Sequence, residues 1–245
     1  MIHVEHLSKS IKGRPVLCDV SLDVPAGRIV GLVGPNGSGK TMLMRCMVGL
    51  VRPSSGSVTL NGCNPWERVG GRSVAREGAW PSIGLILETP AFLDNFTARA
   101  NLELFASIGS GGGCDDIGLA LESVGLDPAD CRTFRSFSLG MRQRLGIACA
   151  LLGDPELLVL DEPTNTLDAE GVARVTSLIE RAARRGATVV LASHDAAVME
   201  GLADEVWSLA EGHVENHWQN NNTWREGHGH LDEDLVGEPR VVAVG

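Results

Sequence analysis

The chain has 245 residues, of which 43% are hydrophobic and 21% are charged, and its formal net charge is -10. This composition is typical of a globular protein with one large domain or two lobes, and it excludes a disordered chain. The acidic balance argues against nucleic-acid binding through a basic face. No apolar stretch approaches the ~20 residues of a membrane span, and the N-terminus lacks the features of a signal peptide, so we expect a cytosolic protein.

The six cysteines, at positions 18, 46, 63, 114, 131 and 149, include no C-x-x-C pair. Scattered thiols in a cytosolic protein are usually small core residues. The sequence therefore predicts neither a disulfide nor a zinc site.

The first part of the chain has three β-like runs, Ile2–Leu7, Val16–Val24 and Ile29–Val33. A glycine-rich segment follows the third run, and a predicted helix from Met42 to Leu50 follows that segment. The order of strand, G-x-x-x-x-G-K-[ST] and helix is that of a P-loop. Its residues here are Gly34, Pro35, Asn36, Gly37, Ser38, Gly39, Lys40 and Thr41.

The P-loop residues have the chemistry that a triphosphate needs. Glycine permits backbone conformations that are closed to other residues, so the loop can turn its N–H groups onto one phosphate chain. We expect Lys40 to reach the β- and γ-phosphates and the Thr41 hydroxyl to hold Mg²⁺. The alternative is an ordinary glycine-rich turn, which an eight-residue match between a strand and a helix makes remote.

The middle of the chain predicts an inserted helical subdomain. A strand at Val58–Leu60, a short helix ending near residues 79–81 and a strand at Ile83–Leu87 precede it. Helical patterns then cover Thr97–Ile108, capped by Thr97, and Asp116–Val124, and Ser138 caps a third helix to about Leu152. No strand is expected between residues 91 and 156.

The last part of the chain alternates strands and helices again. We predict strands at Leu157–Leu160, Thr188–Ala192 and Glu205–Leu209, with helices at Ala169–Arg184 and Asp195–Leu202. A continuous apolar strand is typical of a sheet covered on both faces. Residues 213–245 are interpreted as a polar, acidic C-terminal tail. The spacing of the tail histidines at 213, 217, 228 and 230 is irregular, so a metal site there is the less favoured interpretation.

Two carboxylates end the strand that begins at Leu157. Asp161 fits the role of the Mg²⁺ ligand that accompanies Thr41, and Glu162 fits the group that polarises the attacking water. The alternative is that both carboxylates are ordinary solvent-exposed loop residues without a function in catalysis. The P-loop upstream favours the functional interpretation.

The stretch from Phe137 to Arg144 is the second indicative motif. A serine cap and a nearby glycine begin a helix whose first N–H groups are unpaired, and such a helix start can bind an anion. An ordinary capped helix is the alternative. The position of this stretch, just before the paired carboxylates, favours an anion site.

Over about residues 1–212, these motifs in this order resemble the nucleotide-binding subunit of an ATP-binding-cassette (ABC) transporter. The family's signature would be Ser138-Leu139-Gly140-Met141, its D-loop would be Thr166-Leu167-Asp168, and its switch histidine would be His194. The resemblance implies an α/β P-loop NTPase fold. This fold has a RecA-like core, an antiparallel β-subdomain and an inserted helical subdomain at about residues 91–156.

The resemblance also implies a mechanism. Two subunits, most simply a homodimer, pair head to tail. Each ATP, with its Mg²⁺, lies between Gly34–Thr41 and Met42 of one subunit and Ser138, Leu139 and Gly140 of the other, near Asp168. His194 contacts the γ-phosphate, and a separate transmembrane permease at the cytoplasmic face of the membrane is the partner.

Two departures from the family pattern are informative. Ile11 stands where the family usually stacks adenine on an aromatic ring, so we expect weak ATP affinity and poor discrimination from GTP. Glu88 replaces the Q-loop glutamine; it can still bind Mg²⁺ and act near the phosphates, but it donates no hydrogen bond.

The surroundings of Glu88 and of the signature resemble the bacitracin-resistance and lantibiotic-immunity branch. This resemblance implies export of a peptide antibiotic or a similar amphiphile. Two alternatives stay open. The chain could be a regulatory ATP-gated clamp on a membrane or envelope partner, or a cassette with low ATPase activity that pairs with a more active cassette.

Overall fold

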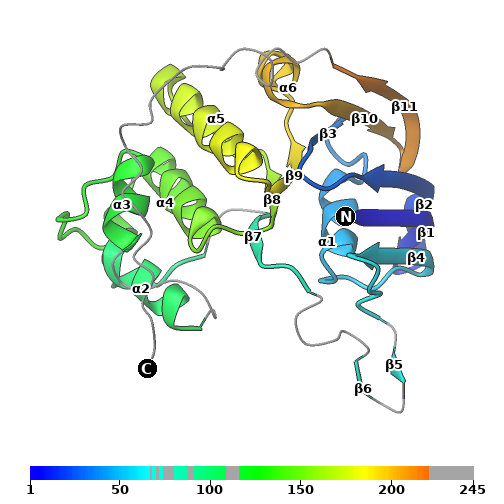
Figure 1. Ribbon diagram of the computed structural model, residues 1–245, viewed down its shortest axis with the longest axis horizontal. Helices are drawn as coiled ribbons and strands as arrows, with labels where there is room; N and C mark the ends of the chain where they lie inside the picture. Colours follow the sequence, from blue (N-terminus) through cyan, green and yellow to red (C-terminus); the bar gives the residue numbers. More distant parts are fainter. Residues whose placement is uncertain (67, 70–71, 74–79, 88–90, 109–115, 221–245) are drawn as a thin grey trace, which may run out of the picture.

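The computed structural model describes residues 1–66, 68–69, 72–73, 80–87, 91–108 and 116–220 (Figure 1). Glu88 and the segment 221–245 therefore lie outside the described residues, as do residues 74–79, which precede the expected end of the short helix. Residues 80 and 81, where that helix was expected to end, are described and are not helical.

One face of the molecule is a three-stranded antiparallel sheet in the order β2-β1-β4. Its strands are β1 (Ile2–Ile11), β2 (Arg14–Val24) and β4 (Ser55–Leu60). Apolar side chains of β1, such as Ile2 and Val4, point into the core, and the side chains between them are exposed. Pairing between β1 and β2 continues beyond the predicted runs through several register shifts, so both strands are longer than the apolar pattern indicated.

The central sheet has six strands in the order β11-β10-β3-β9-β8-β7. Five of them run parallel to one another: β3 (Ile29–Val33), β7 (Ile83–Ile86), β8 (Leu157–Asp161), β9 (Thr188–Ala192) and β10 (Glu205–Ala210). Strand β3 pairs with β10 on one side and with β9 on the other. Its carboxyl end therefore lies near the middle of the row formed by the carboxyl ends of the parallel strands.

The sixth strand corrects the predicted start of the tail. Residues His213–Gln219 form β11, which pairs antiparallel to β10. The reversal occurs at Glu211 and Gly212, both with positive φ. A polar edge strand is held by backbone hydrogen bonds and needs no apolar alternation, so its sequence looked like a tail.

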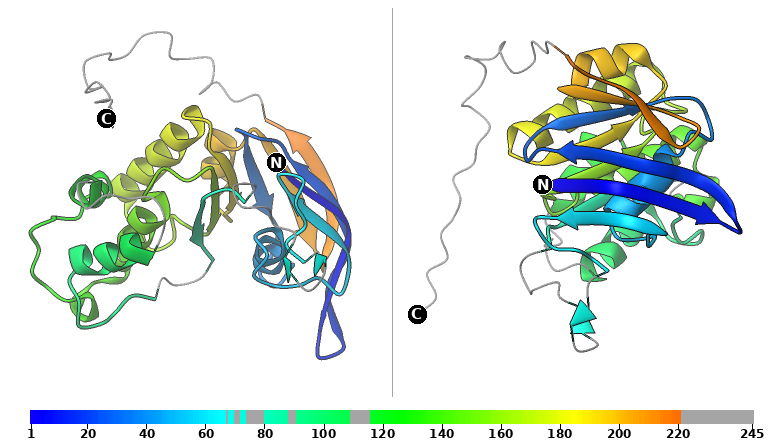
Figure 2. Two further views of the ribbon diagram at one scale, coloured as in Figure 1. Left: turned by 60° about the horizontal axis from the view of Figure 1, so that its bottom comes forward. Right: turned by 90° about the vertical axis from the view of Figure 1, so that its right-hand side faces the viewer.

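Two cores lie on opposite faces of the central sheet. In β8, Leu158 and Leu160 face one core, and Leu157 and Val159 face the other. The strand is thus buried on both faces, as predicted. Helix α1 (Lys40–Met47) lies between the two sheets, in contact with β2, β4 and β9 (Figure 2). Helices α5 (Ala169–Arg184) and α6 (Ala196–Leu202) cover the opposite face.

The helical subdomain lies on the side of the molecule opposite the three-stranded sheet (Figure 1). It contains α2 (Ala98–Ile108), α3 (Asp116–Ser123), the short 3₁₀ helix η1 (Phe134–Ser136) and α4 (Leu139–Leu151). As predicted, the Thr97 hydroxyl accepts a hydrogen bond from Ala100 N at 3.2 Å at the start of α2. No strand occurs in the described part of residues 91–156.

Helix α4 packs closely on the central sheet. A Cβ atom at Gly84 of β7 would lie 1.9 Å from the carbonyl oxygen of Ala150, so no larger residue fits between these elements. The two-residue strands β5 (Arg68–Val69) and β6 (Arg72–Ser73) pair antiparallel in a separate small sheet. Within the ranges described above, no helix combines the length and apolar character needed to cross a bilayer.

Candidate functional site

The P-loop connects β3 to α1 at the edge of the central sheet. Gly34 has a φ of 142°, and a Cβ there would lie 2.0 Å from the Leu209 carbonyl oxygen. Gly39, the N-cap of α1, has a φ of 106°, and a Cβ there would lie 2.7 Å from Leu17. Both the backbone and the space therefore require glycine at these two positions.

The charged and hydroxyl side chains of the loop are partly buried. Lys40 Nζ donates to the Gly34 and Pro35 carbonyl oxygens at 2.7 and 3.1 Å. The Ser38 hydroxyl is buried and has no hydrogen-bond partner among the described residues. A buried group without a partner is costly, and a phosphate oxygen would supply one.

Thr41 at the start of α1 meets Asp161 at the end of β8, and its hydroxyl donates a hydrogen bond to the Asp161 carboxylate. Two hard oxygen ligands beside a phosphate site fit Mg²⁺, which usually keeps several waters and takes few protein ligands. No cluster of three or more His, Cys, Asp or Glu side chains that could hold a metal occurs within the described ranges. The donors present therefore suit a phosphate-bound Mg²⁺.

Glu162 and His194 form a second pair at the same sheet edge. His194 Nδ1 lies 2.8 Å from Glu162 Oε2. Glu162 adopts a left-handed backbone with a φ of 50°, and its N–H donates to the Ala192 carbonyl oxygen at 2.9 Å. Glu162 is the next residue in the chain after Asp161, the Mg²⁺-ligand candidate. The Glu162–His194 pair therefore adjoins the candidate Mg²⁺ site.

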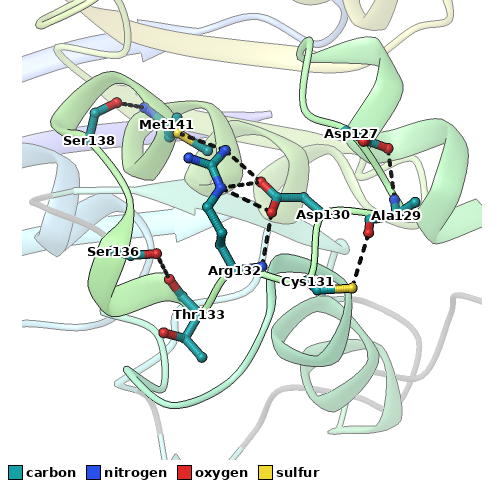
Figure 3. Close-up of polar contacts among 9 residues, drawn as sticks. All are labelled: Asp127, Ala129, Asp130, Cys131, Arg132, Thr133, Ser136, Ser138 and Met141. Carbon is teal, nitrogen blue, oxygen red and sulfur yellow. Dashed lines mark hydrogen bonds and ion pairs between the residues drawn. The ribbon is translucent and has the colours of Figure 1, made fainter.

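The signature segment begins helix α4. Ser138 is the N-cap, and its Oγ accepts from Met141 N at 3.3 Å (Figure 3). Leu139 is 62% exposed. The α4 start is thus presented to solvent, as an intermolecular anion site requires.

A polar turn at residues 127–132 lies beside this helix start (Figure 3). Asp130 accepts hydrogen bonds from the guanidinium and from the backbone N–H of Arg132, and both lower the pKa of Asp130. The guanidinium contact also raises the pKa of Arg132. Arg132 also lies 3.9 Å from the Met141 sulfur. This turn is a link between the end of α3 and the signature.

Asp168 is occupied by contacts within the chain. Its carboxylate caps α5, accepting from Gly171 N at 2.9 Å, and it also accepts from Arg144 at 3.1 Å. Both contacts lower the pKa of Asp168, and the hydrogen bond from Gly171 has a larger effect than the positive charge of Arg144.

A cavity of about 630 Å³ brings much of the predicted site together. Among its lining residues are most of the predicted ones from the P-loop and the β8 end, together with Leu139 of the signature: Asn36, Gly37, Ser38, Gly39, Lys40, Thr41, Met42, Asp161, Glu162 and Leu139. A second cavity, of about 450 Å³, is lined by Gly34, Pro35 and His194.

Among the predicted site residues that the structure describes, four line neither cavity: Ile11, Ser138, Gly140 and Asp168. Ile11 ends β1 and is 43% exposed. Val16 of β2 lines the larger cavity instead. The structure therefore does not bring Ile11 into the larger cavity with the P-loop candidates.

Several lining residues are not among the site residues predicted from the sequence: Val16, Arg45, Leu87, Arg142, Gln143, Asn165 and Thr166. Arg142, Gln143 and Thr166 stood inside or beside quoted motifs, so proximity to the signature and D-loop was a usable signal. Val16 is one apolar residue in a strand, and the sequence carries no signal for it.

Comparisons with known proteins agree with this geometry. Residues 17–165 match the family model described as "ABC transporter". A bacitracin transport ATP-binding protein of Enterococcus faecalis is 38% identical over 87% of this chain and 68% of its own length. A lantibiotic transport ATP-binding protein of Streptococcus pyogenes is 37% identical over 87% of this chain and 89% of its own length.

Solved structures show the same fold. A dimeric bacterial ABC transporter cassette has a TM-score of 0.80 at 24% identity, and the match covers 89% of this chain and 98% of that one. An ATP-binding subunit of an ABC transporter has a TM-score of 0.78 at 26% identity, with 92% of each chain covered.

Proposed function

Since the chain belongs to the ABC transporter family as an ATP-binding subunit, we propose that its ATP hydrolysis powers a separate membrane permease that exports a peptide antibiotic or a similar amphiphile. The main support for ATP hydrolysis is that the P-loop, the Thr41–Asp161 contact and the Glu162–His194 pair lie together at one edge of the central sheet. The export of an antibiotic rests on the names of the bacitracin and lantibiotic transport relatives.

The P-loop residues, Gly34 to Thr41 with Met42, hold the triphosphate in this proposal. Lys40 exchanges its contacts with the Gly34 and Pro35 carbonyl oxygens for contacts with the β- and γ-phosphates. Thr41 and Asp161 hold Mg²⁺. When bound, this ion neutralises charge on the phosphate oxygens.

Glu162 and His194 serve hydrolysis. The Glu162 carboxylate accepts a proton from the water that attacks the γ-phosphorus, the bond to ADP breaks, and phosphate leaves. With both ring nitrogens protonated, His194 donates from Nδ1 to the Glu162 carboxylate, 2.8 Å away, and from Nε2 to the γ-phosphate. Glu88, outside the described residues, is assigned a supporting role near the water and Mg²⁺ on sequence grounds alone.

A second subunit completes the site. The exposed helix start at Ser138, Leu139 and Gly140 contacts the phosphates on the partner's P-loop, and Asp168 lies at the same interface. Neither anion site surrounds the triphosphate alone, so ATP stabilises the dimer and hydrolysis releases it. A homodimer is the simplest arrangement, and dimeric relatives of the same fold support it.

The permease partner would bind at an apolar groove of about 370 Å³, whose lining includes Leu85, Leu87, Phe92 and Phe105. Three of its lining residues, Leu50, Leu85 and Phe105, are large apolar side chains that are exposed to solvent. Such a patch is typical of a protein–protein interface. Binding there would hold the subunit at the cytoplasmic face of the membrane and let the helical subdomain transmit motion.

The permease is tested by trapping. Glu162→Gln, tagged and loaded with ATP in the native host, should retain a multi-span permease in stoichiometric amount after membrane solubilisation, identified by mass spectrometry. Lys40→Ala, which should fail to bind ATP, is the matched control. Recovery of a soluble dimer alone, or with a single-span partner, would replace the transport proposal with the regulatory clamp.

A further inference from the structure

Helix α4 contacts the catalytic turn through the side chain of Gln143. The amide Nε2 donates to the carbonyl oxygen of Glu162 at 3.3 Å and to that of Pro163 at 3.1 Å. Both partners are acceptors, so only the NH₂ end of the side chain fits here. A residue of the signature helix therefore binds two successive backbone groups of the turn that bears Glu162.

This turn depends on contacts from outside itself. Glu162 has a φ of 50°, a left-handed conformation that is unfavourable for a residue with a Cβ. Its N–H donates to Ala192, and its carbonyl oxygen accepts from Asn165 N at 3.2 Å as well as from Gln143. Such conformations persist where the surrounding structure fixes them.

A second contact joins the same two regions. Arg144, the next residue of α4, donates to Asp168 at 3.1 Å, and a Cβ at Gly140 would lie 3.1 Å from the Thr166 carbonyl oxygen. The first turns of α4 are therefore packed along the whole segment from Glu162 to Asp168. Gln143 is the residue of this set that binds the Glu162 backbone.

We propose that Gln143 is a positioning residue for Glu162, so that helix α4 and the catalytic carboxylate move as one unit. This inference rests on the proposed function. In the dimer, α4 presents Ser138–Gly140 to the ATP of the partner subunit, whereas Glu162 acts on the ATP bound to its own P-loop. Closure around one ATP thus aligns the carboxylate for the other.

The chemistry predicts a loss of turnover without a loss of ATP affinity. Gln143 lines the cavity, but its amide is committed to two carbonyl oxygens, and the phosphate contacts are assigned to the P-loop. A misplacement of about 1 Å in a catalytic group can cost on the order of 10²-fold in rate.

The experiment compares ATP hydrolysis by the purified full chain with two substitutions at this position. Gln143→Met keeps the side-chain length but removes the donor, and Gln143→Glu sets a carboxylate against two carbonyl oxygens. Both should lower kcat about tenfold or more and leave KM for ATP within about threefold. Gln219→Met and Gln219→Glu, on the exposed face of β11, make the same chemical changes and should leave kcat unchanged.

Thermal unfolding and ADP binding are measured on every variant, so that a folding defect is recognised. A kcat within twofold of wild type for both Gln143 variants would overturn the inference, as would a parallel loss of ADP binding and of the unfolding midpoint in both. Absence of hydrolysis by the wild-type chain would overturn the proposed function and this inference with it. Normal wild-type turnover with unaffected Gln143 variants would overturn the inference alone.

Discussion

His194 Nδ1 lies 2.8 Å from Glu162 Oε2, although 32 residues separate them in the chain. The contact exists because β8 and β9 are parallel neighbours, and Glu162 and His194 follow the carboxyl ends of these strands. The imidazole thereby orients the carboxylate that follows the Mg²⁺-ligand candidate Asp161. A carboxylate held in this way can act as a general base at the sheet edge where ligands of parallel α/β proteins bind.

The first prediction concerns the two members of this pair. Glu162→Gln keeps the shape of the side chain but cannot accept a proton, so kcat should fall ~100-fold or more. His194→Gln, which keeps a hydrogen-bond donor, should lose less activity. Phosphate release under steady-state conditions measures both rates. Binding of a fluorescent ATP analogue should persist in both variants, and hydrolysis by Glu162→Gln near the wild-type rate would remove Glu162 from the mechanism.

The second prediction concerns adenine binding. Ile11→Tyr should tighten ATP binding about fivefold and increase the preference for ATP over GTP, because an aromatic ring supplies a stacking surface of about 1 kcal/mol. Calorimetric titration gives both affinities. Leu119→Tyr on α3, where the residue is 66% exposed, adds the same ring far from the P-loop and serves as the control.

The structure also suggests a different position for the adenine base. Val16, not Ile11, lines the cavity beside the P-loop. Equal ATP affinity for the wild type and Ile11→Tyr would mean that the base contacts the Val16 region and that position 11 has no part in binding.

The third prediction concerns Asp168, which caps α5 and binds Arg144. Asp168→Ala removes both contacts and should lower the midpoint of thermal unfolding at pH 7. Asp168→Asn keeps a capping oxygen but loses the charge, so it should lower the midpoint less. Calorimetry of the three proteins tests this order, and an alanine variant as stable as wild type would contradict it.

The pH dependence of this effect has a defined sign. The pKa of Asp168 is lowered in the folded state, first by the Gly171 hydrogen bond and then by Arg144. A carboxylate with a depressed pKa contributes stability above its unfolded-state pKa of about 3.9, and that contribution is lost as the pH falls through the folded-state value. The difference between wild type and Asp168→Ala should therefore be full at pH 7 and shrink below about pH 4.

Elements with both apolar periodicity and a cap could be predicted closely from the sequence. The bounds of α5 and β9 agree with the prediction, because Asp168 caps a strongly amphipathic helix and β9 is an uninterrupted apolar strand. Strand β11 was missed because a polar edge strand is held by backbone pairing with β10, which leaves no pattern in the side chains. Tertiary pairing also extended β1 to Ile11.

The residues of the candidate site also fall into two groups: those that a sequence motif indicates and those that only the packing of the fold brings to the site. Residues whose chemistry is fixed by a local motif, such as Lys40, Thr41 and Asp161, can be proposed from the sequence alone, and all three line one cavity in the structure. The contact of Gln143 with two carbonyl oxygens depends on how α4 packs on the central sheet, and the sequence contains no record of that packing. The inward position of Val16 depends likewise on the arrangement of two sheets around α1.

The most direct test of the account is the solution mass of Glu162→Gln with and without ATP, measured by light scattering on a size-exclusion column. The chain mass is 26.0 kDa. We predict the monomer mass without nucleotide and twice that mass with ATP, because in the proposed dimer ATP is held between the P-loop of one subunit and Ser138–Gly140 of the other. A further Ser138→Arg substitution should restore the monomer mass. A Glu162→Gln protein that binds ATP and stays monomeric would contradict the shared site.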